Sequence, residues 1–521
     1  MTVSAARAMA FDILSRVESE GAFASDLLHA ELDPDNARAT AIKPADAALA
    51  TEITLGVLRW RRLLDLLLSG RLKKPVDRLD VPVAIALRMG LYQLRFLERI
   101  PARAAVNESV ELVKRAKKSS AAALVNAVLR RAAEENPGAT SETGAAAILR
   151  GQPAHTGRFS ISAKQLTSLN GIDRIATLHS HPTWLVGRWL ARLGEERTIA
   201  LLEANNRAPR LSMALRDPGS RDDVLAGLES AALKVQPGAL LKTAFAVTGG
   251  SVTQTQAFRQ GLVSIQGEAS QAVPLLLNVR SGHRVLDLCA APGGKTPPLA
   301  RAAEPNGMVV AADRHAHRLS AMRGQFERLH VENIRIVELD AERPLPFGRK
   351  FDRILVDAPC SGTGTLARHP EIRWRLRPEQ LAEFHHLQVA ILSSALEALA
   401  PGGRLVYSTC SLEPEENESV VWEVLHAGPH VPTPGFIPQN PAAFSALTGA
   451  SPTPSGQSAN IALVAPGKSI AALAPLLAPD VAPASLFDSE GFFHTLPGVH
   501  PTDGFFAAAL EKKSDTPKTR P

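Results

Sequence analysis

The sequence predicts an α/β protein whose C-terminal half contains a Rossmann-like, doubly wound parallel sheet. Two observations predict this fold. From Gly282 onward, short apolar runs alternate with stretches of helical periodicity, which is the pattern of successive βαβ units. Before that point the chain has apolar positions at helical spacing and then a shorter region that mixes a helical run with a strand. We therefore expect an all-helical domain, a small α+β domain and an α/β domain, in that order.

The first region is predicted to be helical because its apolar residues recur every three or four positions. The predicted helical runs are Ala5–Val17, Ala47–Leu68, Pro82–Leu97 and Val106–Ala133. Basic residues cluster in this region, in Arg59-Trp-Arg-Arg62, Arg71-Leu-Lys-Lys74 and Lys114-Arg-Ala-Lys-Lys118. Such clusters are either solvated helix faces or a surface for RNA phosphates, and the sequence leaves both open. The net charge of +6 and an isoelectric point near 9.3 are compatible with an anionic partner.

The α/β region contains five apolar runs that are predicted to be its parallel strands. They are Arg284–Leu288, Met308–Ala312, Ile334–Leu339, Asp352–Val356 and Arg404–Ser408. Two later segments, Gly491-Phe-Phe and Asp503–Leu510, are predicted to form an antiparallel pair at the edge of the sheet.

Changes in composition set the remaining boundaries. A helical run, Trp184–Asn205, precedes a strand at Leu211–Leu215 in the small α+β domain. Gly-, Ala- and Ser-rich or proline-rich stretches without a period are predicted to be linkers or insertions. The predicted organisation is a helical domain (1–135), a linker or insertion (136–175), the α+β domain (176–262), the α/β domain (263–512) with a proline-rich insertion (428–483), and a disordered tail (513–521).

Composition excludes several classes of protein. Three cysteines cannot form a disulfide framework, and their wide spacing excludes a CxxC metal knuckle, so we expect no metal. The first twenty residues carry charges where a signal peptide needs an apolar core, and no stretch offers 18 uninterrupted apolar residues. With only two tyrosines and five tryptophans, an aromatic stacking platform for RNA is not expected. We expect a soluble, cytoplasmic monomer without a membrane segment.

The stretch Asp287–Thr296 is predicted to bind a cofactor. A strand runs into a turn with two glycines, which let the backbone approach a ligand, and a helix then begins. The Gly-Lys-Thr ending is similar to a P-loop, but the P-loop requires glycine at the position of Cys289. Nucleotide triphosphate binding is therefore disfavoured, and a nucleotide-like ligand without that phosphate cradle remains.

Acidic residues end successive strands at Asp287, Asp313 and Asp340. Asp313 lies 20 residues after Gly293, the spacing at which a carboxylate accepts hydrogen bonds from ribose hydroxyls. Asp340 is placed to reach an adenine edge. A single acid after a strand is often only a helix cap, but three in succession indicate an adenosyl ligand, and S-adenosylmethionine suits a turn that is not a P-loop.

Each of the three cysteines follows a predicted strand, at Cys289, Cys360 and Cys410. A lone cysteine is usually a buried apolar side chain. Two of these, however, lie in chemically suggestive loops, Asp357-Ala-Pro-Cys-Ser-Gly-Thr-Gly364 and Tyr407-Ser-Thr-Cys-Ser-Leu-Glu-Pro-Glu-Glu-Asn417. Because the carboxyl ends of parallel strands meet at one edge, the thiols could face one site. The first loop combines an acid that can hydrogen-bond a pyrimidine with a thiol for covalent chemistry.

These stretches resemble the Nop/Sun family of RNA 5-cytosine methyltransferases, and within it the bacterial RsmB (Sun/Fmu) type. The matching segments are Leu286–Thr296, Phe351–Gly364, His369-Pro-Glu-Ile-Arg-Trp374, Val406–Asn417 and Thr502-Asp-Gly-Phe-Phe-Ala507. Gln266-Gly-Glu-Ala-Ser270 resembles a further family element, with Gly267 in place of the usual Asp. The helical domain resembles the NusB-like RNA-binding domain of the same type. The resemblance implies a class I methyltransferase fold for the α/β domain.

The resemblance also implies roles for individual residues. Cys410 would be the nucleophile, Cys360 would assist product release, and Asp357 would position the base. S-Adenosylmethionine would be bound by Cys289, Ala290, Ala291, Pro292, Gly293, Gly294, Lys295, Asp313, Arg318, Asp340 and Asp357. The substrate would be a cytosine of 16S rRNA, free or in early assembly. Two alternatives remain: a DNA 5-cytosine methyltransferase with Cys360 as the nucleophile, and an RNA-binding or assembly factor on a degenerate methyltransferase scaffold.

Overall fold

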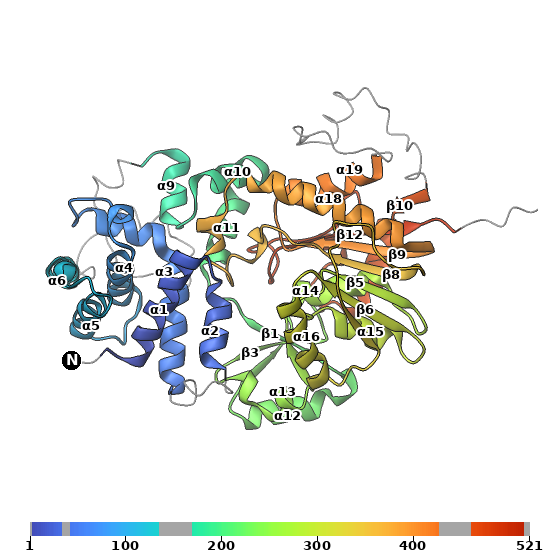
Figure 1. Ribbon diagram of the computed structural model, residues 1–521, viewed down its shortest axis with the longest axis horizontal. Coiled ribbons are helices and arrows are strands. Elements are labelled where there is room, and N and C mark those ends of the chain that lie inside the picture. The colour runs from blue at the N-terminus through green and yellow to red at the C-terminus, as the bar shows by residue number, and fades with distance from the viewer. Residues whose placement is uncertain (1–2, 34–41, 135–168, 427–459, 515–521) are drawn as a thin grey trace, which may run out of the picture. The chain divides into compact units, whose positions relative to one another are not determined.

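A computed structural model describes residues 3–33, 42–134, 169–426 and 460–514 (Figure 1). The chain divides into two compact units. The first comprises Met1–Ala208 together with Leu366–Arg375, and the second comprises Pro209–Thr365 together with Leu376–Pro521. Within the described residues, no helix is both long enough and apolar enough to cross a membrane.

The first unit is helical, as the sequence predicts. Its core is formed by the apolar stripes of the helices, with Ile53, Leu63 and Leu87 fully buried. In Figure 1, α1, α3 and α4 pack side by side. The helices are α1 (Ala5–Glu20), α2 (Ala24–Leu32), α3 (Pro44–Ser69), α4 (Val81–Phe96), α5 (Ala102–Arg115), α6 (Ala122–Glu134), α9 (Gly171–Leu178), α10 (Thr183–Leu193), α11 (Glu195–Asn206) and the short α17 (Ile372–Arg375).

Two predicted helical runs are each broken into two helices. The run Val106–Ala133 is interrupted at Lys117, whose φ of 58° lies in the left-handed region that ends helices. The run Trp184–Asn205 is interrupted at Gly194, with φ of 77°. In both cases the apolar period continues across the break, so periodicity alone does not reveal it. The sequence also does not predict α2.

The basic cluster Arg59–Arg62 is neither a solvated face nor an open RNA surface. Arg59 is 4% exposed and donates to the carbonyl of Ala367. The other two arginines pair within the unit: Arg61 with Glu18, and Arg62 with Asp173. These guanidinium groups hold the helices together. The clusters at Lys73–Lys74 and Lys114–Lys118 do contain exposed side chains.

The segment Leu366–Arg375 lies within the predicted α/β range 263–512 but packs in the helical unit. Arg373 is fully buried there and donates to Asn206 Oδ1 at 2.8 Å and to the carbonyl oxygens of Ser180, Asn205 and Leu366. Trp374 Nε1 donates to the carbonyl of Leu58 at 2.6 Å. The segment is therefore fixed in the helical unit by hydrogen bonds from two of its side chains to backbone carbonyl groups.

The second unit begins with a small antiparallel sheet of order β2-β3-β1-β4. Its strands are β1 (Leu211–Leu215), β2 (Lys234–Pro237), β3 (Ala244–Thr248) and β4 (Val263–Ile265), with α12 (Arg221–Ser230) and α13 (Gln256–Arg259) between them. The predicted strand at Leu211–Leu215 is confirmed. The helices that precede it cluster with the helical unit instead, so the predicted 176–262 range is divided between the two units.

The larger sheet has the order β10-β12-β9-β8-β5-β6-β7, and β11 pairs with β12. All five predicted parallel strands are confirmed, as is the antiparallel pairing of β11 with β12. The strands are β5 (Arg284–Leu288), β6 (Met308–Asp313), β7 (Ile334–Glu338), β8 (Phe351–Asp357), β9 (Leu399–Thr409), β10 (Ile461–Leu463), β11 (Phe493–Thr495) and β12 (Phe505–Lys512).

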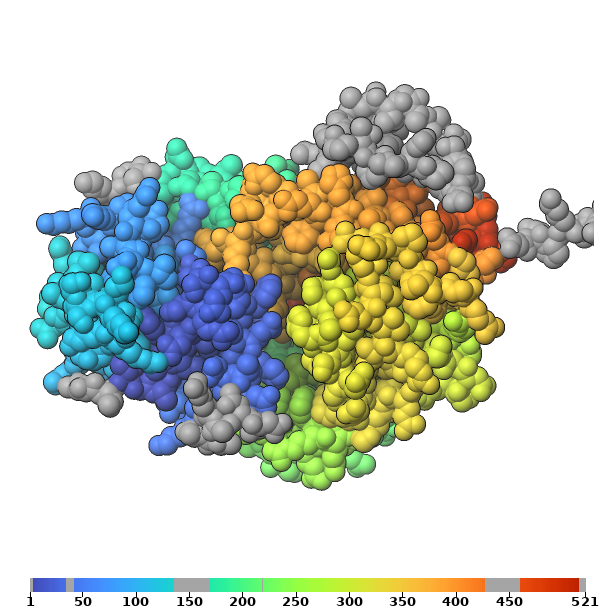
Figure 2. Space-filling model, viewed as in Figure 1, coloured from blue at the N-terminus to red at the C-terminus, as the bar shows by residue number. Residues whose placement is uncertain are grey.

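Helices cover both faces of this sheet, as Figure 1 shows. Successive side chains of a strand point to opposite faces, so Val285 packs in the same core as Leu299 of α15, and Leu286 packs with Leu392 of α18. The outer side of α16 is exposed (Figure 2). The helices are α14 (Glu268–Ala272), α15 (Thr296–Ala303), α16 (Ala316–Arg328), α18 (Gln380–Ala398), α19 (Glu418–His426) and α21 (Pro466–Leu473).

The predicted proline-rich insertion 428–483 requires a correction. Its residues 460–483 are part of the fold: β10 pairs with β12 (Ile461 opposite Lys512), and Leu473 and Leu477 are buried in the core of the sheet. Its apolar residues, and not its prolines, decide the structure there. Residues 428–459 lie outside the described residues, as do 136–168 of the predicted linker and 515–521 of the predicted tail.

Candidate active site

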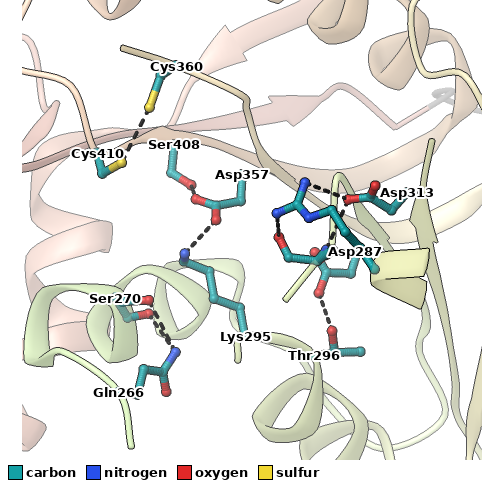
Figure 3. Close-up of polar contacts among 12 residues, drawn as sticks. Gln266, Ser270, Asp287, Lys295, Thr296, Asp313, Asp357, Cys360, Ser408 and Cys410 are labelled. Carbon is teal, nitrogen blue, oxygen red and sulfur yellow. Dashed lines mark hydrogen bonds and ion pairs between the residues drawn. The ribbon is translucent and has the colours of Figure 1, made fainter. Parts of the chain in front are cut away.

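The carboxyl ends of the parallel strands β5, β6, β8 and β9 bring the predicted site residues to one edge of the sheet (Figure 3). Asp287 is the fourth residue of β5, Asp313 ends β6 and Asp357 ends β8. Cys410 directly follows β9. Because parallel strands share their direction, these side chains form one site although they are far apart in the sequence.

The turn between β5 and α15 is tight. Cys289 adopts φ of 64° and Gly293 φ of 96°, both in the left-handed region. A Cβ at Gly293 would lie 3.1 Å from side-chain atoms of both Met322 and Phe326, which pack behind the turn. The glycine therefore lets the turn lie close against α16.

Asp287 is buried below this turn. One carboxyl oxygen, Oδ2, accepts a hydrogen bond from Thr296 Oγ1 at 2.6 Å. The other, Oδ1, is buried and has no hydrogen-bond partner among the described residues. Burial raises the pKa of Asp287 to about 7, against the opposing effect of the Thr296 bond. A buried acceptor without a donor fits a ligand that brings a donor to the turn.

Asp313 fixes the other side of the turn. Its side chain is 4% exposed; it accepts from the backbone N–H of Ala291 at 3.2 Å and of His315 at 3.0 Å. Arg318 lies 3.7 Å from the same carboxylate and donates to the carbonyl of Ala291 at 3.0 Å. Arg318 thus joins the turn to α16.

Asp340 follows β7 and is not brought to the turn by any contact of the described residues. Its carboxylate accepts from the backbone of Glu342 at 3.2 Å and lies 3.5 Å from Arg343 Nε. Its predicted role at an adenine edge stays a prediction.

A partly buried ion pair joins the turn to the cysteine loops. Lys295 Nζ lies 2.6 Å from Asp357 Oδ2, and Ser408 Oγ donates to Asp357 Oδ1 at 2.9 Å (Figure 3). The ammonium group also lies 5.3 Å from the centre of the Phe505 ring, within the range of a cation–π contact. The Asp357 side chain is 29% exposed, so its carboxylate is fixed in place and still accessible.

The sulfur atoms of Cys360 and Cys410 lie 3.4 Å apart. Both residues are partly buried, and both are free thiols. The hydrogen bond with Cys410 and burial raise the pKa of the Cys360 thiol, and the charge of Glu416 contributes in the same direction. Cys289, in the turn itself, packs against the core of the sheet, and burial raises the pKa of its thiol.

Comparison with known proteins shows which family this chain belongs to. Residues 274–511 match the 16S rRNA methyltransferases RsmB/F, residues 4–134 match the NusB family, and residues 181–253 match the ferredoxin-like domain of the RsmF/B-like methyltransferases. The ribosomal RNA small subunit methyltransferase B of Vibrio cholerae is 34% identical over 77% of this chain and 86% of its own. This chain belongs to that methyltransferase family.

Further relatives agree. The probable ribosomal RNA small subunit methyltransferase B of Bacillus subtilis is 29% identical, over 98% of this chain and 100% of its own. The crystal structure of PH0851 covers 98% of this chain and 100% of its own with a TM-score of 0.69 at 22% identity, which supports the fold. The predicted fold class is confirmed, with NusB, ferredoxin-like and Rossmann-like methyltransferase parts.

The methyl donor of this family is S-adenosylmethionine. The turn fits that cofactor, because it offers a buried acceptor on Asp287, an ordered carboxylate on Asp313 and a backbone that approaches closely at Gly293. Gly267 directly precedes α14 as its N-cap residue and has no side chain to contribute. The neighbouring Gln266 Nε2 donates to Ser270 Oγ at 3.2 Å (Figure 3).

Sequence reasoning missed the residues that connect the two cysteine loops. Glu416 is fully buried and accepts hydrogen bonds from Ser361 and Ser411, the residues that follow the two cysteines. Gly364 N donates to the carbonyl of Cys410 at 2.9 Å, and Gly504 N donates to the carbonyl of Gly364 at 2.8 Å. The acidic residues after Cys410 are visible in the sequence, but their pattern does not show that Glu416 is buried between the two loops.

Proposed function

We propose that this protein transfers a methyl group from S-adenosylmethionine to carbon 5 of a cytosine in 16S rRNA, through a covalent bond between Cys410 and the base. The observation that carries the proposal is the 3.4 Å separation of the Cys360 and Cys410 sulfurs beside the Lys295–Asp357 pair. Two thiols and a carboxylate at the cofactor edge are the groups that this chemistry needs. Membership of the methyltransferase family supports the reaction class.

The chemistry requires a nucleophile because carbon 5 of cytosine does not take a methyl group directly. Addition of the Cys410 thiolate to carbon 6 makes carbon 5 nucleophilic. S-Adenosylmethionine supplies the methyl group that carbon 5 then acquires. A base removes the remaining proton from carbon 5, the 5,6 double bond re-forms, and the bond from carbon 6 to sulfur breaks, so that Cys410 leaves as a thiolate.

The Cys360 thiol is placed to support Cys410 as the nucleophile. The pKa of Cys360 is raised, so this thiol stays protonated and can donate a hydrogen bond to a Cys410 thiolate. A hydrogen bond to the charged form of a group stabilises that form. Cys360 would then assist the final elimination, directly or through a water molecule.

Asp357 is suited to hold the base. Lys295 and Ser408 fix its carboxylate from two sides, and part of it remains exposed. A carboxylate fixed in this way can hydrogen-bond the ring nitrogen and the exocyclic amine of cytosine as charge develops on the ring. The base must leave any stack to reach both Asp357 and Cys410, which favours free or early-assembly RNA as the substrate.

The RNA assignment rests on the family and on charge. The relatives are described as ribosomal RNA small subunit methyltransferases, the N-terminal part matches the NusB family, and the chain carries a net charge of +6. We propose 16S rRNA as the partner and the cytoplasm as the location on this basis.

The test compares the wild-type protein with Cys410→Ala and Cys360→Ala on 16S rRNA transcribed in vitro, with a labelled methyl donor. We expect methylation by the wild type, none by Cys410→Ala with RNA binding retained, and a denaturant-resistant protein–RNA adduct with Cys360→Ala. Methylation that survives Cys410→Ala but not Cys360→Ala would make Cys360 the nucleophile. An RNA that is bound but never methylated by the wild type would favour an assembly factor.

The base is identified by bisulfite sequencing of rRNA from a strain that lacks the protein. A cytosine that becomes unprotected only in that strain is the expected result. An unchanged 16S pattern would refute the substrate assignment.

A further inference from the structure

One carboxylate is bonded to both cysteine loops. Glu416 accepts from the backbone N–H of Ser361 at 2.7 Å and also from its hydroxyl. It accepts from Ser411 Oγ at 2.6 Å and from Gln388 Nε2 at 3.1 Å. Ser361 directly follows Cys360, and Ser411 directly follows Cys410. The two serine hydroxyls are themselves 3.1 Å apart.

Burying a carboxylate at this position is energetically unfavourable for the folded protein. Glu416 is fully buried, and no cation pairs with it in the part of the chain that the structure describes. Burying an unpaired charge is unfavourable unless several hydrogen bonds compensate. Burial raises the pKa of Glu416, while the bonds from Ser361 and Ser411 oppose that shift. Because burying Glu416 costs free energy, its presence indicates that the site needs hydrogen-bond acceptors, which an apolar side chain would not supply.

The site requires two oxygen atoms that both act as hydrogen-bond acceptors and never as donors. A glutamine in the same place would offer one acceptor oxygen and an NH₂ group that donates. Both serine hydroxyls donate to Oε1, whereas the Ser361 N–H and Gln388 Nε2 donate to Oε2. A glutamine oxygen in place of Oε1 could still accept from both hydroxyls, but its NH₂ group would then face the Ser361 N–H, a donor of the Cys360 loop. Only a carboxylate accepts from both serine hydroxyls and from this N–H at once.

We propose that Glu416 is a positioning residue that clamps the two cysteine loops together and so sets the distance between the Cys360 and Cys410 thiols. It touches neither thiol's sulfur nor the cofactor turn, so it acts through Ser361 and Ser411. This proposal rests on the proposed function, in which both thiols act on one cytosine ring. A ring that must meet both sulfurs tolerates little change in their separation.

Other contacts hold the rest of this edge without Glu416. Leu412 N donates to Thr363 Oγ1 at 2.8 Å, and Asn417 Nδ2 donates to the carbonyl of Ser411 at 3.0 Å. The bond from Gly364 N to the Cys410 carbonyl joins the loops a second time. Loss of the clamp should therefore loosen the thiol pair and leave the sheet folded.

The test uses Glu416→Gln in the full-length protein, with Glu423→Gln as the matched control. Glu423 lies on α19 and bonds His385, not the cysteine loops. The probe is phenylarsine oxide, which two thiols chelate: both thiol protons and the oxide oxygen leave as water, and two arsenic–sulfur bonds form. Chelation needs both sulfurs close together, requires no RNA and involves no change of oxidation state.

We expect Glu416→Gln to weaken phenylarsine oxide binding about tenfold or more, and Glu423→Gln to match the wild type. Cys360→Ala gives the affinity of a single thiol as the reference. With RNA, kcat should fall by about 10- to 100-fold while the KM values for RNA and methyl donor stay within about threefold.

Equal arsenical affinity and equal kcat for Glu416→Gln and Glu423→Gln would overturn the clamp. If Glu416→Gln does not fold, Ser411→Ala and Ser361→Ala test it, because each removes one bond between the carboxylate and a loop. Both should lower affinity and kcat in the same direction, and unchanged values would again overturn it. A wild type that binds the arsenical but methylates no cytosine would refute the proposed function and leave the clamp to be judged by the arsenical alone.

Discussion

Lys295 Nζ lies 2.6 Å from Asp357 Oδ2, so one ion pair connects the cofactor turn after β5 with the loop that carries Cys360. The lysine side chain is 11% exposed and the aspartate side chain 29%, which places the pair at the boundary between core and site. A group that binds at the turn and a base that binds at Asp357 would therefore meet at this pair.

Lys295→Met should lower kcat/KM for methylation by about 100-fold, because Asp357 loses the cation that holds it and its remaining partner is Ser408. Steady-state kinetics with labelled methyl donor measure this. Lys468→Met, which removes a 65% exposed lysine 3.5 Å from Glu511, serves as the control and should leave kcat/KM unchanged. A Lys295→Met enzyme with wild-type kinetics would show that the pair is only structural.

Asp287 should make stability depend on pH. Its folded-state pKa of about 7 lies above the unfolded value, so the protonated carboxyl stabilises the fold. That contribution is complete below about pH 4, falls as the pH rises and is lost above about pH 7. Asp287→Asn keeps a neutral group of the same shape, and should gain up to about 4 kcal/mol relative to wild type between pH 4 and 8.

Urea unfolding of the wild type and of Asp287→Asn, without the cofactor and at several pH values, measures this difference in the free energy of unfolding. Asp340→Asn, beyond the end of β7, should follow the wild-type pH dependence. Parallel pH curves for Asp287→Asn and wild type would show that this carboxyl is ionised in the folded protein throughout the range.

Arg373→Met should destabilise the protein by about 2–4 kcal/mol, because several buried carbonyl oxygens lose their donor at once. Chemical denaturation followed by circular dichroism gives the change in the free energy of unfolding. Arg377→Met, on an exposed residue four positions later, should stay within about 0.5 kcal/mol of wild type. A fully stable Arg373→Met protein would mean that water replaces the guanidinium without cost.

Gly504→Ala should impair both stability and catalysis. A Cβ there would lie 2.6 Å from Leu412 Cδ2 and 2.8 Å from Gly364 Cα, so the backbone beside Cys410 must shift. We expect a loss of about 1–3 kcal/mol in stability and a reduced kcat. Gly467→Ala, whose Cβ would meet nothing within 4 Å, is the control and should be neutral in both measurements. An unaffected kcat for Gly504→Ala would show that this approach does not position the thiol loop.

Much of the catalytic part could be predicted because its signals are local. The five parallel strands follow from short apolar runs, and Asp287, Asp313, Asp357 and Cys410 stand at or near their ends, so strand direction alone brings them to one edge. The breaks at Lys117 and Gly194 were missed because the apolar period continues through them. The folded part of the proline-rich segment was missed because three residues of β10 gain their stability only from pairing with β12.

The sequence by itself determined the family, the fold class and the set of residues that chemistry would use, because motifs and periodicity are carried by neighbouring residues. Only the tertiary structure decided which groups meet: that Arg59 is buried in its own unit, that Arg373 anchors a distant segment among the helices, and that Glu416 bonds both cysteine loops. These contacts join residues far apart in the chain or on different strands. The energy of these contacts depends on burial and on the geometry of the partners, and neither can be predicted from the local pattern of residues.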